Sequence, residues 1–168
     1  MSIIGVDIGS YNITCAYAAG MGGQNNRGGI QIVLNEGSGR FTPSLATFDG
    51  DSRAAGALAK PKARSNFKNT VTLIKRLIGQ KYSDPEVQRI LKHLHYKTSQ
   101  TEQDEIGIHV QFEGKTRVFL PEQIVAFQLA NVADFTKEHT KMAVSDMVVS
   151  VPSYFNERQR QAMLDACR

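Results

Sequence analysis

The sequence offers little for disulfide, metal or membrane chemistry. It contains no tryptophan, two cysteines and no apolar run near the ~18 residues that span a bilayer. Cys15 and Cys167 lie at opposite ends of the chain, which favours neither a disulfide framework nor a site of clustered metal ligands. No basic segment precedes a long apolar stretch at the N-terminus, which argues against a secretory signal. We therefore expect a cytoplasmic protein with two free thiols and no membrane contact.

Several common site motifs are also missing. There is no G-x-x-x-x-G-K-[ST] loop, and the glycine-rich stretch 20–29 lacks the strand-to-helix context of a dinucleotide-binding fingerprint. The four histidines show no metal-ligand spacing, and no serine sits in a nucleophile elbow. These absences argue against the two most common nucleotide folds, a zinc site and acyl transfer.

Acidic residues are absent from one long segment. Residues 53–83 hold no Asp or Glu but eight Lys and Arg residues, whereas the rest of the chain has twelve basic against sixteen acidic residues. A basic segment of this kind can attract a polyanion. Charge alone leaves both nucleic acid and nucleotide phosphate open as partners.

The residues that are present indicate one globular α/β domain. The chain has 168 residues, of which 41% are hydrophobic and 21% charged. Apolar runs at 3–9 and 12–19 predict two strands around a tight turn, and a third strand follows at 30–34. These strands should form an antiparallel meander, with 20–29 as a hairpin loop.

The middle of the chain predicts helices and a hairpin. Ser65 or Asn66 can cap a helix that ends at Gly79, and its apolar residues fall at helical spacing: Phe67, Val71, Ile74 and Ile78. Asp84 and Pro85 open a second helix that runs to about His93. Residues 97–105 are polar and indicate a loop, and 106–112 with 116–120 predict a two-stranded hairpin.

The last third predicts helix, strand and helix. A long helix should run from Pro121 to about Lys141, with one buried face made by Val125, Leu129, Val132 and Thr136. A buried strand follows at 146–151, and Asn156 can cap a final helix that runs to Arg168. No glycine or proline ends that helix, so we expect the chain to be a piece of a longer protein.

Asp7 is the first candidate for chemistry. It stands at the end of the first strand, before the turn Gly9-Ser10-Tyr11-Asn12, whose backbone N–H groups could form an anion nest. Beside a phosphate the carboxylate would be repelled by about 4 kcal/mol at ~4 Å and an effective dielectric of ~20. A cation between the two solves this, and Mg²⁺ suits one carboxylate plus phosphate oxygens. The alternative is a strand-end aspartate that only serves the turn.

Lys75 is the second candidate. It borders the predicted buried stripe, so its stem can be buried while its ammonium reaches a cleft. One donor aimed at developing charge can be worth ~10²-fold or more in rate. The alternative is an ordinary solvated lysine at the edge of a stripe.

Five segments, in this order, resemble the 70-kDa heat-shock chaperones. They are Ile4–Gly9, Asn35-Glu36 with Arg40–Ser44, Asn69–Val71 through Lys75–Gly79, Ser83–Pro85, and Val149–Asn156 with Arg158–Gln161. The resemblance spans nearly the whole chain. It implies an actin-like, ribonuclease-H-like ATPase lobe with a helical and β-hairpin insertion subdomain. Residues 1–36 and 115–168 would form the inner subdomain, and 37–114 the outer one.

The resemblance also implies roles for individual residues. Asp7 matches the aspartate that orients a hydrated Mg²⁺, and Gly9, Ser10, Tyr11 and Asn12 match the first phosphate loop. Lys75 matches the lysine near the γ-phosphate and the attacking water. Pro152 and Arg160 match a proline and an arginine that relay nucleotide state to the peptide-binding domain.

The phosphate loop departs from the family pattern. The family usually has two threonines and a tyrosine where this chain has Ser10, Tyr11 and Asn12. The asparagine at position 12 resembles the pattern of the 110-kDa branch of the family. Members of that branch bind ATP but act mainly as nucleotide-exchange partners of the ordinary chaperones. Residues 75–79 and 154–161, in contrast, are similar to the ordinary chaperones.

The resemblance therefore implies a heat-shock chaperone domain that binds ATP or ADP with Mg²⁺ and hydrolyses ATP only in the full-length protein. Its partners would be unfolded clients, bound through domains outside this chain, and co-chaperones or a partner 70-kDa chaperone. The alternative is a 110-kDa-like exchange factor or holdase. A sugar or acetate kinase would not share 42–44 and 75–79, and a nucleic-acid module would need exposed aromatics interleaved with the basic residues of 53–83.

Overall fold

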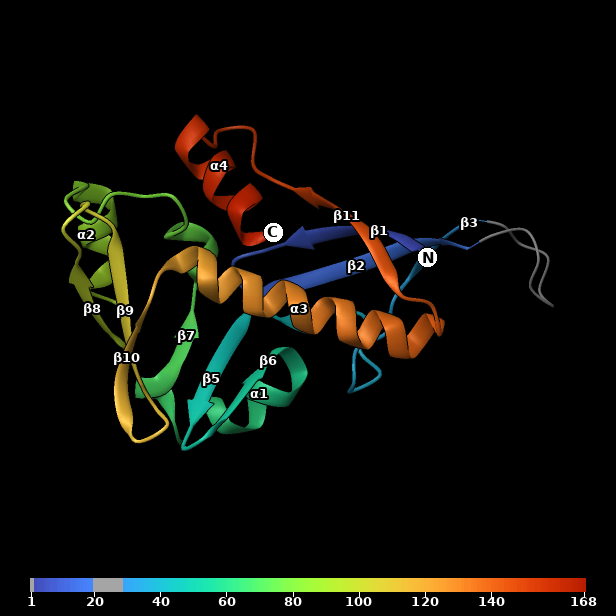
Figure 1. Cartoon of the computed structure of the whole chain (residues 1–168), viewed down its shortest axis with the longest axis horizontal. Coiled ribbons are helices and arrows are strands. Elements are labelled where there is room, and N and C mark those ends of the chain that lie inside the picture. Colours follow the sequence, from blue (N-terminus) through green and yellow to red (C-terminus); the bar gives the residue numbers. More distant parts are fainter. Residues whose placement is uncertain (1, 20–28) are drawn as a thin grey trace.

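The computed structural model describes residues 2–19 and 29–168 (Figure 1). The hairpin loop predicted over 20–29 lies, apart from Gly29, outside the described residues. Both cysteines are free, as predicted; Cys15 is buried and Cys167 is exposed. Among the described residues, no helix combines the length and the apolarity that a bilayer crossing requires.

A five-stranded sheet forms the larger layer of the fold. β1 (Ser2–Ile8), β2 (Asn12–Ala19) and β3 (Gly29–Ile32) are antiparallel neighbours, which confirms the predicted meander. β11 (Val144–Ser150) pairs with β1 in parallel, and the short β4 (Thr42–Pro43) pairs with β2. The parallel pair is what brings the end of β11 beside the end of β1.

The two faces of this sheet have different surroundings. Ile4, Val6 and Ile8 of β1 are buried, whereas the alternate residues Ile3 and Asp7 are exposed. α3 (Pro121–Thr140) covers the buried face, and its predicted inward residues, Val125, Leu129, Val132 and Thr136, are all buried. α4 (Glu157–Ala166) packs beside α3 and begins at the predicted cap. Asp7 therefore lies on the face away from α3.

The predicted helix over 66–78 is wrong. The structure has a 3₁₀ turn η1 (Phe67–Asn69), a strand β7 (Thr70–Thr72) and a second 3₁₀ turn η2 (Ile74–Arg76). The run Thr-Val-Thr is β-branched and pairs with β5 (Leu45–Asp49), and Leu73 then adopts a left-handed backbone that no helix continues through. Strand pairing with β5 therefore determines the local structure, in spite of the helical spacing of the apolar residues.

β5 is the centre of a three-stranded sheet that the sequence patterns do not predict. Its other neighbour is β6 (Ser52–Ala55), and α1 (Gly56–Ala63) follows directly. α1 contains Pro61, a residue that disfavours helix interiors, which explains why the pattern does not indicate a helix there.

The third sheet has the order β10-β9-β8. The predicted hairpin is confirmed as β9 (Ile106–Phe112) and β10 (Lys115–Phe119), and the predicted second helix as α2 (Pro85–Leu91), capped by Asp84. The loop predicted for 97–105 is wrong in its first part, because β8 (Lys97–Gln100) pairs with β9 at the sheet edge. An edge strand in partly exposed surroundings needs no apolar alternation, so the polar sequence of β8 does not indicate a strand.

Phe48 connects these layers. Its ring, from β5, stacks on Phe119 at 5.2 Å and meets Phe112 edge-on at 5.6 Å between ring centroids. The ring of Phe127 from α3 lies 6.3 Å away. Phe48 is 2% exposed, so one aromatic cluster joins both small sheets to the long helix.

Candidate functional site

Asp7 is held at the junction of β1 and β11. The parallel register sets it opposite Ser150, whose hydroxyl donates a hydrogen bond of 2.6 Å to Oδ1 of Asp7. Thr14 of β2 is its partner on the other side. Asp7 borders a hollow of about 670 Å³ on the exposed face of the sheet, which we call the sheet-face hollow. Its carboxylate is open to water, which fits a metal ion that keeps its own water ligands.

The turn after Asp7 is built on Gly9. The N–H of Gly9 donates to the carbonyl of Asn12 at 2.8 Å, and a Cβ on Gly9 would lie 2.5 Å from that oxygen. The predicted tight turn is thus confirmed, and only glycine fits its first position. The N–H of Ser44 donates to the carbonyl of Tyr11 at 2.8 Å, while the Tyr11 side chain is 72% exposed.

Lys75 and Ser10 share one hollow. It measures about 370 Å³, and we call it the Lys75 hollow; it is lined by Ser10, Lys75, Arg76, Gln80, Glu86, Ile90, Tyr154, Phe155 and Gln159. Lys75 is half-buried on η2 between the fully buried Ile74 and Leu77. The structure therefore places Lys75 and Ser10 around one hollow, although Lys75 lies on a 3₁₀ turn and not on the predicted helix.

Asp7 borders a different hollow from Lys75. The sheet-face hollow includes Asp7 and Ser150, while the Lys75 hollow begins at Ser10, three residues further along the chain. Along the chain, Asp7 and Ser10 are joined through Ile8 and Gly9. Among the residues that the structure describes, no group of three or more His, Cys, Asp and Glu side chains could hold a metal ion. A metal at Asp7 would accordingly need ligands from water or from a bound nucleotide.

Arg160 ties the loop after β11 to α4. Its Nε donates to the carbonyl of Phe155 at 2.9 Å, and Nη2 donates to the carbonyls of Ser153 at 3.2 Å and Pro152 at 3.5 Å. Tyr154, in the same loop, lines the Lys75 hollow together with Phe155. These hydrogen bonds connect Pro152 and Arg160 to the loop that forms part of the wall of that hollow.

Sequence reasoning assigns no role to three residues of this wall. Tyr154, Phe155 and Gln159 lie about eighty positions after Lys75 in the chain, and only the tertiary fold brings them together. The segment 149–156 stands out in the sequence through its resemblance alone. The cap of α4 is the one local signal, and it is confirmed: the side chain of Asn156 accepts from the N–H of Gln159 at 2.9 Å.

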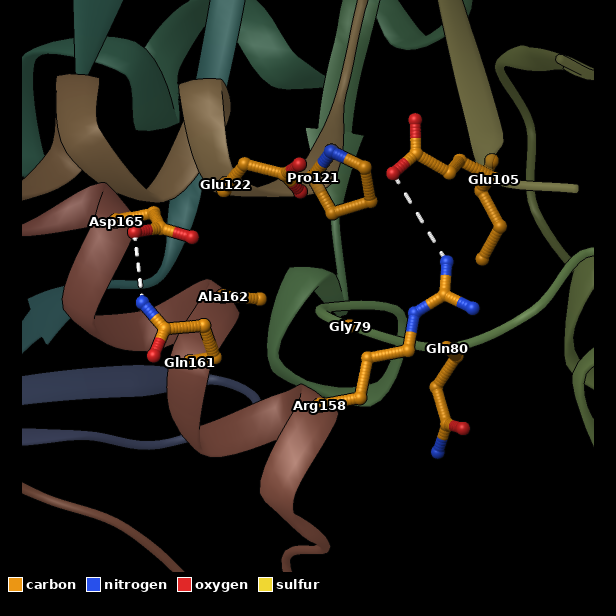
Figure 2. A pocket seen from close by; sticks show the side chains of 10 residues that line it. Gly79, Gln80, Glu105, Pro121, Glu122, Arg158, Gln161, Ala162 and Asp165 are labelled. Atoms are coloured by element: carbon orange, nitrogen blue, oxygen red, sulfur yellow. Dashed lines mark hydrogen bonds and ion pairs between the residues drawn. The ribbon is translucent and has the colours of Figure 1, made fainter. Parts of the chain in front are cut away.

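A third hollow lies next to this wall (Figure 2). It measures about 220 Å³ and is lined in part by Gln80, which also lines the Lys75 hollow, and by three carboxylates: Glu105, Glu122 and Asp165. Burial raises the pKa of Glu122, and the neighbouring Glu105 and Asp165 carboxylates add to this, while Arg158 opposes it. Glu122 is thus held where its charged form is disfavoured.

Comparison with known proteins shows to which family the chain is similar. A family model described as Hsp70 protein matches residues 3–168. The 97 kDa heat shock protein of Strongylocentrotus purpuratus is 37% identical over 166 residues, 99% of this chain and 18% of that protein. Heat shock 70 kDa protein 15 of Arabidopsis thaliana is 35% identical over 166 residues, 99% of this chain and 19% of that protein. Heat shock protein 110 of Caenorhabditis elegans is 36% identical over 168 residues, 99% of this chain and 21% of that protein.

The fold is that of the N-terminal lobe of an actin-like ATPase domain, as the resemblance implied. The chain belongs to the Hsp70 family, and its similarity to the 110-kDa branch is supported by the 97-kDa and 110-kDa relatives. It spans about a fifth of the length of the curated relatives named above.

Proposed function

We propose that residues 1–168 are the first lobe of the ATP-binding domain of a cytoplasmic heat-shock chaperone. The full-length protein would bind Mg-ATP between this lobe and a second one and couple the nucleotide state to protein folding. The observation that carries the proposal is the shared hollow of Ser10 and Lys75, two positions far apart in the sequence. Family membership supports nucleotide binding in general.

Each residue of the site would then have a distinct task. Gly9, Ser10, Tyr11 and Asn12 would hold phosphate oxygens through the turn at the end of β1. Asp7 would orient a hydrated Mg²⁺, which would offset the repulsion between the carboxylate and the phosphates. Lys75 would place its ammonium near the terminal phosphate, where negative charge moves during hydrolysis.

Pro152 and Arg160 would relay the nucleotide state. The three hydrogen bonds from Arg160 to the 152–155 loop support this role, because movement at Tyr154 or Phe155 in the Lys75 hollow would pull on the guanidinium. We assign 1–36 and 115–168 to the inner subdomain of the lobe and 37–114 to the outer one. Clients and co-chaperones would bind through parts of the protein outside this chain.

Calorimetric titration of the full-length protein with ATP tests the nucleotide site. We expect binding that strengthens with Mg²⁺, and we expect Asp7→Asn to remove most of this strengthening, because the neutral amide cannot orient the hydrated ion. The control is Asp51→Asn, an exposed aspartate at the tip between β5 and β6. Absence of ATP binding, or tight binding by residues 1–168 alone, would contradict a site shared between two lobes.

A second candidate function is a 110-kDa-like exchange factor or holdase with little ATP hydrolysis of its own. Ser10, Tyr11 and Asn12 favour this function, because they depart from the usual family pattern of the phosphate loop. The similarity to the 97 kDa heat shock protein and to heat shock protein 110 also favours it. Stopped-flow measurement of nucleotide release from a partner 70-kDa chaperone separates the two. An exchange factor accelerates release, and an ordinary chaperone does not.

Replacing Tyr11 with threonine should raise single-turnover ATP hydrolysis in the full-length protein by about fivefold. The exposed phenol of Tyr11 cannot set a hydroxyl where threonine would, and one neutral hydrogen bond is worth about 1 kcal/mol. Tyr11→Phe is the matched control and should leave the rate unchanged. Equal rates for Tyr11→Thr and the wild type would show that this position does not limit hydrolysis.

A further inference from the structure

Gly79 makes a close backbone contact between the Lys75 segment and α4. A Cβ on Gly79 would lie 2.5 Å from Cα of Gln159 and 2.9 Å from both the carbonyl oxygen of Arg158 and the N of Gln159. All three are backbone atoms, so no change of rotamer could make room. These distances are well inside van der Waals contact. Glycine is therefore required here by space.

The left-handed backbone alone would not require it. Gly79 has φ +64°, but Leu73, which begins the same segment, has φ +57° and carries a full side chain. The segment thus accommodates a side chain at one left-handed position and has no room for one at the other. What distinguishes Gly79 is the approach of α4.

The segment that ends at Gly79 is stiff. The N–H groups of Leu77 and Ile78 both donate to the carbonyl of Ile74, at 2.9 and 3.1 Å, and the N–H of Gln80 donates to the carbonyl of Leu77 at 3.1 Å. Ile74, Leu77 and Ile78 are fully buried. Closely packed segments of this kind transmit a displacement instead of absorbing it. A shift at Gly79 therefore reaches Lys75, which lies four residues earlier in the same segment.

The other side of the contact is equally fixed. Gln159 is 5% exposed, and the cap formed by Asn156 holds its N–H. The next residue is Arg160, which holds the 152–155 loop. Gln80 and Gln159, one from each side of the contact, both line the Lys75 hollow.

An ion pair near this contact joins α4 to Glu105, the residue before β9. Figure 2 shows the side chain of Arg158 reaching from α4, beside the Gly79 loop, to Glu105, with 3.9 Å between Nη2 and Oε1. Both side chains are about one-third exposed or more, and exposed ion pairs contribute little. The ion pair is therefore separate from the backbone contact at Gly79, where the Lys75 segment meets α4.

We propose that Gly79 is a positioning residue for Lys75. Its missing side chain seats the Lys75 turn directly on the first turn of α4, which fixes the ammonium relative to Ser10 and links it to the loop held by Arg160. This role deepens the proposed ATPase function and rests on it.

Gly79→Ala in the full-length protein tests the role. We expect kcat for ATP to fall by about tenfold or more with KM changed by less than about twofold, because a small misplacement of a catalytic group costs rate and not binding. Gly114→Ala is the matched control: Gly114 has φ +69°, and a Cβ added there would meet no atom within 4 Å. It carries the same backbone strain without the close approach, so its kinetics should stay those of the wild type.

A double variant separates positioning from general damage. If Gly79 acts through Lys75, Gly79→Ala combined with Lys75→Ala should be no slower than Lys75→Ala alone. If Gly79→Ala does not fold, Asn156→Ala replaces it, because loss of the cap loosens Gln159 without adding an atom. Multiplicative losses in the double variant, or an equal fall in kcat for Gly114→Ala, overturn the proposal.

A measurement without nucleotide distinguishes this proposal from the ATPase proposal. The rate at which an acylating reagent modifies the Lys75 amine, followed by mass spectrometry, should change in Gly79→Ala and stay constant in Gly114→Ala. An unchanged rate in Gly79→Ala overturns the positioning role. A wild type that turns over no ATP contradicts the ATPase proposal, and the acylation rates then decide the positioning role alone.

Discussion

Replacing Lys75 with alanine in the full-length protein should slow single-turnover ATP hydrolysis by ~10²-fold or more, while the affinity for ATP changes little. Lys75 is half-buried and lines the same hollow as Ser10, so partial burial weakens the solvent screening of its charge beside the turn that we propose holds the phosphates. A charge held in such a place stabilises charge that develops in the transition state more than charge already present in bound ATP. The measurement is a rapid-quench time course with ATP and enzyme premixed.

Lys81→Ala is the control for Lys75→Ala. Lys81 belongs to the same basic segment but is exposed, so its loss removes the same formal charge without touching the Lys75 hollow. Both the rate and the affinity should stay near the wild type. A parallel loss of rate and affinity in Lys75→Ala would assign the lysine to ground-state binding, and an unchanged rate would remove it from the site.

The parts of the fold that sequence predicts are those where one signal stands alone. The apolar run at 3–9 and the inward face of α3 at Val125 and Leu129 are such signals, and the structure confirms both. The segment 66–78 carries two signals at once. Val71, Ile74 and Ile78 fall at helical spacing and are indeed buried, but the β-branched residues around Val71 also suit a strand, and pairing with β5 decides the outcome.

The candidate site divides in the same way. Asp7 and the Gly9 turn can be found locally, because a strand end followed by a glycine turn is a short pattern. Lys75 can be suggested from its place beside buried residues, although the helix on which that suggestion rests is absent. The wall made by Tyr154 and Gln159 cannot, since it depends on how α4 packs against a segment about eighty residues earlier. In the sequence, Gly79 indicates only the end of a helix, because its close approach to α4 depends on the tertiary fold.

Phe48→Ala should lower the free energy of unfolding of the chain by ~3–5 kcal/mol, the usual cost of deleting a fully buried phenylalanine. The ring is 2% exposed and touches aromatic rings from β9, β10 and α3, so the cavity would open where three layers meet. Neighbours that come from separate elements cannot all close in on a cavity at once, which favours the upper part of that range. Urea unfolding followed by circular dichroism measures the change.

Phe41→Ala is the matched control for Phe48→Ala, because it deletes the same atoms from a ring that is 67% exposed. Its cost should stay within about 0.5 kcal/mol, as is usual for surface positions. β5 carries Phe48 and also pairs with β7, the strand that leads into the Lys75 turn. Loss of Phe48 should therefore loosen the Lys75 hollow as well as the core. Equal costs for the two variants would show that the aromatic cluster does not hold the layers together.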